Sequence, residues 1–350
     1  MVQPKISIII PVYNASNCLE KCLNSLVLQT EKRLEIIAVD DGSQDESLQI
    51  LQDFARHHPQ LKVLSQANGG PGAARQLGLQ HATGDYIMFC DADDSYTPNM
   101  CALMLQKIEE YNADWGVCDA QVEGVQSRNR TKELTTSNHG AYTPQNIPSL
   151  GMGLWCYIFR KSVIDKFSVC FPSFFYGEDA AFIAKYLYVS YSYFVLAEKL
   201  YVYNANETSL MGTISQAQGL KRLTDSIGVQ FDLYRFLEQH NLFSTHQNTY
   251  FDQLEKMLIS MAEHLNADSI TAITDKLQNF LQNLPVSKNF ELLHAVKNGN
   301  IRHFQTLLRQ TNQVRTRRIK ICGVSVVKIK HQPAAQTVFL FNIPVYKRHY

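Results

Sequence analysis

Short runs of β-branched residues alternate with amphipathic helical patterns through the first 120 residues, and no other feature constrains the fold as strongly. Strands are expected at residues 6–10, 34–39, 63–64, 85–90 and 114–118. Helices are expected between them, at residues 18–28, 45–57 and 98–111, with a further helix ending near residue 82. Such alternation is typical of an α/β domain, a mostly parallel sheet flanked by helices.

The pattern is interrupted once before the α/β region ends. Between residues 119 and 150 the periodicity is lost and Ser, Thr, Asn and Gln accumulate, which predicts an irregular excursion on the surface. The α/β pattern then resumes, with one helix and two strands expected at residues 178–189, 193–197 and 200–203.

A long helical pattern follows the α/β region. Residues 216–309 are expected to be helical, with breaks at Asn241, Asn266 and Pro285. We therefore expect three parts, an α/β domain, a helical region and a β-rich tail, at residues 1–215, 216–313 and 314–350. Within the α/β domain, the carboxyl ends of the strands in residues 1–120 are expected to bind a ligand.

The tail differs from the body in charge. Beyond Glu291 the chain has eleven Lys or Arg residues and no Asp or Glu, whereas the remainder has 22 basic and 32 acidic residues, a net charge of −10. Two apolar units, 321–328 and 340–347, resemble each other and predict a terminal hairpin. A basic hairpin of this kind can pack on the acidic body or bind an anionic membrane surface.

Composition restricts the class of protein. An apolar share of 45% and a charged share of 19% are those of a folded globular protein. The longest apolar runs are too short to cross a bilayer, and the first residues enter a strand pattern at once, so no signal peptide is expected. The eight cysteines form no CxxC pair, which favours reduced thiols in the cytoplasm.

Three carboxylates follow the strand expected at residues 85–90. Asp91, Asp93 and Asp94 are close in sequence, and their charges repel one another unless a cation is present. Hard oxygen ligands suit Mg²⁺ or Mn²⁺, which also bridge phosphates. The alternative is an acidic turn that caps the following helix with help from Ser95 and Thr97. Because the turn follows an apolar strand, we favour the metal site.

A second acidic motif, Val39 to Ser43, follows the strand expected at residues 34–39. A carboxylate here could accept a hydrogen bond from the imide N–H of uracil, which cytosine lacks. An Asp-Gly turn in which Ser43 or Asp45 caps the next helix is a very common use of such residues.

The stretch from Asn68 to Arg75 is rich in glycine and ends in a cation. Glycine lets the backbone approach a phosphate closely, and arginine can bind one in bidentate fashion. The stretch has neither the dinucleotide-binding spacing of glycines nor the Gly-Lys of a P-loop. A turn followed by an exposed helical arginine explains it as well.

Glu178 and Asp179 open the helix expected at residues 178–189. A carboxylate at a helix N-terminus is stabilised by the helix dipole and can serve only as a cap. It can equally act as the general base that accepts a proton from a hydroxyl. The sequence leaves these two interpretations open.

Taken in order, these motifs resemble those of family-two glycosyltransferases of the GT-A fold. The shared motifs begin at Pro11, Val39, Asn68, Asp91 and Gly177, and the resemblance extends over about residues 4–205. The tail is similar to those of some bacterial lipooligosaccharide and capsule transferases. The resemblance implies a metal-dependent inverting transferase that uses a UDP-sugar.

Residues of the donor half receive roles from this resemblance. It implies that Pro11, Tyr13 and Asp41 contact the uridine, and that Arg75 lies on the phosphate side. Asp91 would face the ribose or the sugar.

The metal and acceptor roles also follow from the resemblance. It implies that Asp93, with Asp94 beside it, binds Mn²⁺ or Mg²⁺. Asp179 would be the general base with Glu178 as its neighbour, and Trp155 would shape the acceptor pocket.

These expectations combine into one functional hypothesis. The chain would transfer a hexosyl or N-acetylhexosaminyl group from a UDP-sugar to a glycan or lipid-linked hydroxyl, in lipopolysaccharide or capsule synthesis. The basic tail would hold it at the inner face of the cell membrane. A nucleotidyltransferase and a non-catalytic nucleotide-sugar-binding module are the alternatives. Nucleic-acid binding is not expected, because the basic excess is confined to the tail.

Overall fold

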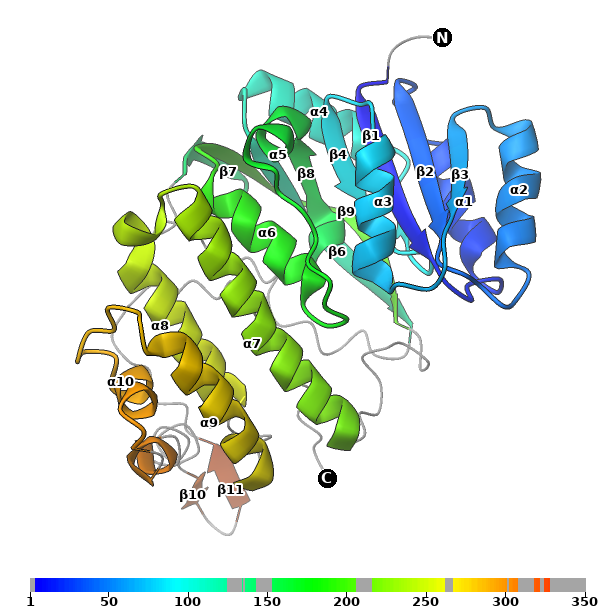
Figure 1. The fold of residues 1–350 in the computed structure, drawn as a ribbon. Helices are drawn as coiled ribbons and strands as arrows, with labels where there is room; N and C mark the ends of the chain where they lie inside the picture. The colour runs from blue at the N-terminus through cyan, green and yellow to red at the C-terminus, as the bar shows by residue number, and fades with distance from the viewer. Residues whose placement is uncertain are drawn as a thin grey trace. The chain divides into compact units, whose positions relative to one another are not determined.

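The structure is a computed structural model of the 350-residue chain. It describes residues 4–124, 134, 136–142, 153–205, 216–261, 267–300, 302–307, 318–321 and 324–327. The chain divides into two compact units, with a boundary between Thr213 and Ile214. Figure 1 shows the helices and strands of both units.

The first half of unit one alternates strands and helices in the predicted order. Its elements are β1 (Ile6–Val12), α1 (Leu19–Val27), β2 (Leu34–Asp40), α2 (Ser47–His57), β3 (Leu61–Ser65), α3 (Pro71–His81) and β4 (Tyr86–Phe89). The four strands pair in parallel in the order β3-β2-β1-β4. All their carboxyl ends therefore lie at one edge of the sheet.

The second half of unit one makes the sheet mixed. Its elements are β5 (Ser95–Tyr96), α4 (Met100–Glu110), β6 (Trp115–Gly124), β7 (Asn138–Ala141), the 3₁₀ turn η1 (Leu154–Cys156), β8 (Tyr157–Arg160), α5 (Lys161–Phe167), α6 (Glu178–Tyr188) and β9 (Ser192–Ala205). The sheet continues from β4 as β8-β6-β9-β5, and β7 also pairs with β9. β8 is antiparallel to both of its neighbours, whereas β6 and β9 are parallel.

Two sequence-based expectations for this half were wrong. The expected excursion over residues 119–150 includes ordered strand: β6 continues to Gly124, and β7 pairs with β9. The two strands expected at 193–197 and 200–203 are one strand, β9, with a change of register opposite Asp119. In both cases pairing with a distant strand orders residues whose local pattern is polar.

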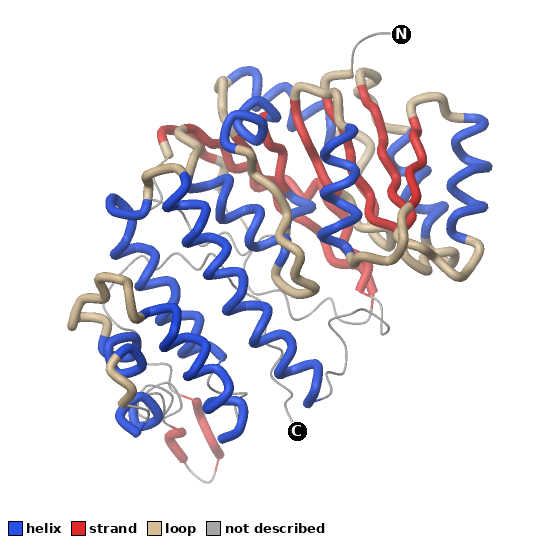
Figure 2. The backbone as a smooth tube through the Cα atoms, in the orientation of Figure 1, coloured by secondary structure: helices blue, strands red, loops and turns tan. Residues whose placement is uncertain are grey.

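Helices lie on both faces of the sheet (Figure 2), and the central strands are buried accordingly. All four isoleucines of β1 are fully buried, as a strand covered on both sides requires. Helix α1 buries the predicted apolar face: Leu19, Cys22, Leu23 and Leu26. This packing fixes the strand ends that carry the motifs.

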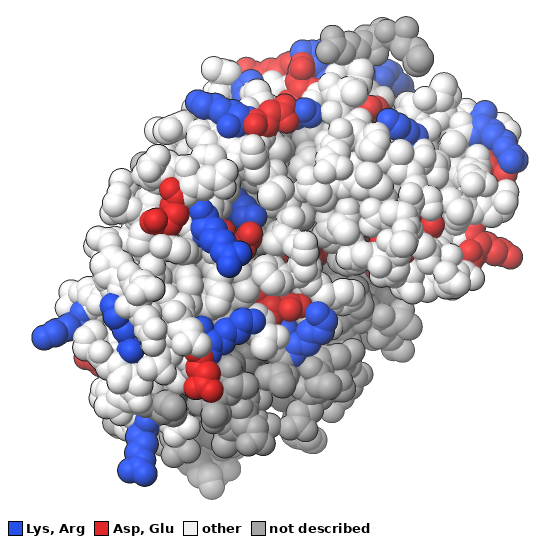
Figure 3. Space-filling view, in the orientation of Figure 1, with Lys and Arg blue, Asp and Glu red and all other residues white. Residues whose placement is uncertain are grey.

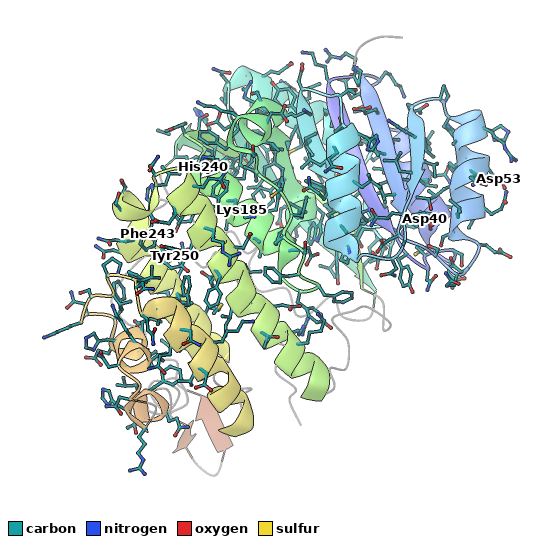
Figure 4. The ribbon with its side chains drawn as sticks, in the orientation of Figure 1. Asp40, Asp53, Lys185, His240, Phe243 and Tyr250 are labelled. Carbon is teal, nitrogen blue, oxygen red and sulfur yellow. The ribbon has the colours of Figure 1, made fainter. Side chains whose placement is uncertain are left out.

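Unit two is mainly helical, as expected. Its helices are α7 (Gln216–Gln239), α8 (Phe243–Met261), α9 (Ala267–Leu281) and α10 (Glu291–Lys297), and residues 302–307 are also helical. Asn241 has a φ of 57° between α7 and α8, and Pro285 lies between α9 and α10, so both breaks are confirmed. The third expected break, Asn266, lies outside the described residues. Phe243 and Tyr250 pack edge to face in the core of this unit (Figure 4).

The described part of the tail contains a short hairpin. β10 (Arg318–Ile321) and β11 (Val324–Val327) pair in antiparallel fashion. Both strands lie near the first of the two expected units, and the second, residues 340–347, is outside the described residues. Among the helices of the described ranges, none combines the length and apolarity of a membrane span.

Candidate active site

The loops after β1 and β2 form one wall of the candidate site. β1 and β2 pair in parallel up to their last residues, so the loops that follow meet. The backbone N–H of Asn14 donates to Ser43 Oγ over 3.1 Å, and Asn14 itself has a φ of 49°. Pro11 is half-buried, and Tyr13 is 50% exposed beside these loops. The loops thus present an aromatic ring at the carboxyl edge of the sheet.

Asp41 organises the glycine-rich loop. Its carboxylate, only 3% exposed, accepts hydrogen bonds from the backbone N–H groups of Gly69 and Gly70 and from Gln66 Nε2, each 2.8 Å long. The preceding residue, Asp40, is also buried at the end of β2 (Figure 4). A carboxylate has about four acceptor positions, so these three donors leave room for one more.

Small residues bring α3 close to α6. Gly70 has a φ of +86°, a conformation that residues with a side chain rarely adopt, and Pro71 begins α3. A Cβ atom added at Gly72 would lie 2.9 Å from Glu178 Cγ. The N-termini of these two helices are therefore in direct contact, which places Arg75 next to the start of α6.

Arg75 joins three motifs that are far apart in the sequence. Its guanidinium donates from Nη2 to Asp91 Oδ1 over 2.7 Å and from Nη1 to Glu178 Oε1 over 2.8 Å. The Arg75 side chain is only 8% exposed. Its Nε–H has no partner in the structure. A buried cation between two carboxylates, with an unpartnered Nε–H, is suited to an additional anionic ligand.

Burial shifts the acidities of the two carboxylates at the start of α6. Burial and the charge of Asp179 raise the pKa of Glu178 to about 7, against the opposing effect of Arg75. Burial also raises the pKa of Asp179, again opposed by Arg75. Asp179 Oδ1 accepts the backbone N–H of Ala180 over 2.7 Å. A half-buried carboxylate with a raised pKa is a better proton acceptor than an exposed one.

The acidic turn after β4 contains carboxylates in two environments. Asp91 and Asp93 are half-buried, and Asp91 is paired with Arg75. Asp94 is 1% exposed, and it accepts hydrogen bonds from the Tyr201 hydroxyl at 2.6 Å and the Asn204 backbone N–H at 2.7 Å. Burial and the charges of Asp91 and Asp93 raise the pKa of Asp94 to about 8.

The donor set at this turn fits a divalent cation that a substrate helps to bind. Within the described residues, no group of three or more His, Cys, Asp or Glu side chains could hold a metal ion by itself. Mg²⁺ is commonly bound by one or two carboxylates together with substrate phosphates rather than by a complete protein cage. Asp91 and Asp93 are suitable carboxylates, since both are half-buried at the carboxyl edge of the sheet.

Trp155 lies beside the same turn. Its indole stacks on the ring of Tyr201 with centroids 4.3 Å apart, and on the ring of Tyr203 at 5.8 Å. No motif in the sequence predicted a role for Tyr201, Tyr203 or Asn204. Alternation along the strand expected at residues 200–203 places both tyrosines on one face, but which face that is depends on the sheet.

The mixed sheet, the acidic turn and the glycine-rich loop at its carboxyl edge are features of the GT-A glycosyltransferase fold. A solved structure of Staphylococcus aureus TarS, residues 1–349 in complex with UDP-GlcNAc, superposes with a TM-score of 0.66. The match covers 93% of this chain and 97% of that one at 22% identity, and the predicted fold class is thereby confirmed.

Comparison of sequences points to one family. Residues 7–169, a little under half of the chain, match the family described as glycosyl transferase family 2. An uncharacterized glycosyltransferase of Escherichia coli, YibD, is 31% identical over 220 residues, and EpsJ of Bacillus subtilis is 30% identical over 216 residues. In both cases the match covers 59% of this chain and 63% of the relative, so the chain spans a little under two thirds of these relatives.

Proposed function

We propose that the chain is a metal-dependent inverting glycosyltransferase that moves a sugar from a UDP-sugar to a hydroxyl group. The observation that carries this proposal is the contact of Arg75 with both Asp91 and Glu178. It connects the turn suited to a diphosphate and its cation with the helix start that bears the candidate base. A donor and an acceptor bound at these two places would meet.

The donor would bind along the carboxyl edge of β1, β2 and β4. Pro11 and Tyr13 would contact the uridine, and Asp41 would accept the imide N–H of uracil with its remaining acceptor position. Arg75 would contribute its unpartnered Nε–H to the phosphate side. The complexes of TarS with UDP and UDP-GlcNAc support a UDP-sugar donor and a hexosyl or N-acetylhexosaminyl group.

Mn²⁺ or Mg²⁺ would be held by Asp93, with Asp91 beside it, whereas the family resemblance placed Asp94 beside Asp93 and Asp91 towards the ribose or sugar. When bound, the cation would neutralise the charge that develops on the leaving diphosphate. The half-buried positions of Asp91 and Asp93 leave their carboxylates within reach of a ligand at the sheet edge.

Asp179 would act as the general base. It would take the proton from the acceptor hydroxyl as the hydroxyl oxygen forms a bond to the anomeric carbon and the bond to the UDP oxygen breaks. Attack opposite the leaving group inverts the anomeric configuration in a single step. Glu178 would hold Arg75 in place and keep a second negative charge near the base.

The acceptor would lie on the side of Trp155, whose stacked rings suit the apolar face of a sugar. A glycan or lipid-linked acceptor of lipopolysaccharide or capsule synthesis is consistent with the bacterial relatives. The eleven basic residues after Glu291 would attract the anionic inner face of the cell membrane, where such acceptors are found.

The decisive experiment measures release of UDP from a panel of UDP-sugars, with and without sugar acceptors. Activity should require Mn²⁺ or Mg²⁺ and should be abolished by a chelator. Formation of pyrophosphate from a sugar phosphate and a nucleoside triphosphate would instead indicate a nucleotidyltransferase. Tight UDP-sugar binding without turnover under all conditions would indicate a binding module.

A further inference from the structure

Asp94 differs from its acidic neighbours because its side chain is hydrogen-bonded to strand β9. Its Oδ2 accepts from the Tyr201 hydroxyl at 2.6 Å, and its Oδ1 accepts from the Asn204 backbone N–H at 2.7 Å. Both donors belong to β9. With an exposed fraction of 1%, the carboxylate is committed to this strand. As a metal ligand, Asp94 would have to give up these short hydrogen bonds.

Further bonds attach β9 to the backbone of the acidic turn. Asn204 Nδ2 donates to the carbonyl oxygen of Asp93 over 2.7 Å. The backbone N–H of Asp91 donates to the Tyr201 hydroxyl over 3.3 Å. Tyr201 thus receives a hydrogen bond from one end of the turn and donates one to the other, while Asn204 binds the middle.

The ring of Tyr201 extends this connection to the acceptor side. Trp155 stacks on it with an interplanar angle of 20°, and the Tyr96 ring meets it edge on at 5.7 Å. The indole is therefore supported by the ring of Tyr201, and the hydroxyl of Tyr201 is held by Asp94. This series of contacts joins the turn that would hold the cation to the wall that would hold the acceptor.

We propose that Asp94 is a positioning residue that holds the Trp155 indole in place through Tyr201, and that the metal is left to Asp93 and Asp91. This inference rests on the proposed glycosyltransferase function. It assigns Tyr201 to the selection of the acceptor sugar, since its ring supports the stacking surface of Trp155. It also joins the acidic turn after β4, which would hold the cation, and the side of Trp155, which would hold the acceptor, into one structural element.

A matched pair of substitutions separates a ligand from a positioning residue. Asp93→Asn and Asp94→Asn each replace one carboxylate by an amide of the same shape. We expect Asp93→Asn to raise the Mn²⁺ concentration needed for half-maximal UDP binding by about tenfold or more, because a charged hard ligand is lost. Asp94→Asn should stay within about threefold, because the Tyr201 hydroxyl can rotate to accept from the amide.

Fluorescence of Trp155 reports the positioning directly and needs no metal. The chain has two tryptophans, and the spectrum of a Trp155→Phe variant isolates the Trp155 contribution by difference. In the metal-free chain, Tyr201→Phe and Asp94→Ala should raise acrylamide quenching of Trp155 about twofold, as the stacked indole loosens. Asp93→Ala should leave the quenching unchanged. Circular dichroism and thermal unfolding identify any variant that fails to fold.

The Mn²⁺ dependence of UDP binding and the quenching of Trp155 also separate this inference from the proposed function. A shift for Asp94→Asn as large as that for Asp93→Asn would overturn the positioning role, as would unchanged quenching in Tyr201→Phe. Should Asp94→Ala fail to fold, Tyr201→Phe and Asp94→Asn still test the positioning role of Asp94. If the unaltered chain shows no Mn²⁺-dependent UDP binding, the proposed function fails, while the quenching of Trp155 still tests the link to Asp94.

Discussion

The two units of the chain use charged residues in different ways. In unit one, Arg75 is buried between carboxylates that lie 16 and 103 residues away in the sequence. In unit two, the ion pairs Lys221–Asp225 and Lys256–Asp252 each join residues four apart on one helix. On the face drawn in Figure 3, basic and acidic side chains lie beside one another rather than in patches of one sign.

This difference shows which charges carry information about function. An exposed pair along a helix contributes at most about 1 kcal/mol and can form wherever the spacing allows. A buried cation between distant carboxylates costs desolvation free energy that a stable fold does not require. Its presence at the carboxyl edge of the sheet therefore indicates a site rather than a structural device.

The largest expected effect tests the base in unit one. Asp179→Asn retains the shape and one acceptor oxygen but removes the basic carboxylate. We expect kcat for UDP-sugar turnover to fall by about 10²–10⁴ while UDP affinity is unchanged. The control is Asp252→Asn in unit two, which should have normal turnover. Normal turnover in Asp179→Asn, or a loss of UDP affinity instead, would contradict the assigned role.

The next largest effect is on the free energy of unfolding, when a buried cation and an exposed cation are each removed. Arg75→Met leaves the Asp91 and Glu178 carboxylates without their shared partner and should lower the free energy of unfolding by about 3–5 kcal/mol. Lys256→Met, the matched change in unit two, should lower it by no more than about 1 kcal/mol. Urea unfolding of both variants at neutral pH measures the contrast. Equal effects would mean that the Arg75 contacts contribute no more than a surface pair.

A smaller effect concerns the pH dependence of turnover. Because burial raises the pKa of Glu178 to about 7 and also raises that of Asp179, the rate should increase with pH as the pair loses its protons. Glu178→Gln removes a negative neighbour and frees Arg75 to favour ionised Asp179. The midpoint of the pH–rate profile should therefore move to lower pH. An unchanged or higher midpoint would argue that the two carboxylates do not titrate together.

The smallest effect on turnover is expected from the tail. A chain ending at Gln313 lacks eight of the eleven basic residues that follow Glu291 and keeps the motifs of the first unit. Basic residues near an anionic bilayer contribute about 1 kcal/mol each, screened by salt. The full chain should co-sediment with phosphatidylserine vesicles at low salt, and the shortened chain should not, while both release UDP equally. Equal sedimentation, or unfolding of the shortened chain, would favour a hairpin packed on the body.

The sequence by itself determined the elements whose burial pattern is local. Apart from β5, which was not predicted, the strands and helices up to residue 118 were predicted within a few residues, because apolar periodicity along each element reflects the face that it buries. The same locality explains the motifs: the acidic turn, the glycine-rich stretch and the pair Glu178-Asp179 each lie at the end or the start of an element. The residue types of these motifs are visible in the sequence, and their order was enough to indicate the family that they resemble.

Only the tertiary structure decided what these residues contact. Whether Arg75 faces solvent or two carboxylates depends on the packing of α3 against α6, which no local pattern encodes. Asp94 was grouped with Asp93 because they are adjacent in sequence, yet its bonds go to β9, more than a hundred residues later. Strand pairing likewise ordered the polar end of β6 and joined β9 into one strand. Such contacts depend on how distant elements pack together, and a single sequence shows each element's preferences but not its neighbours.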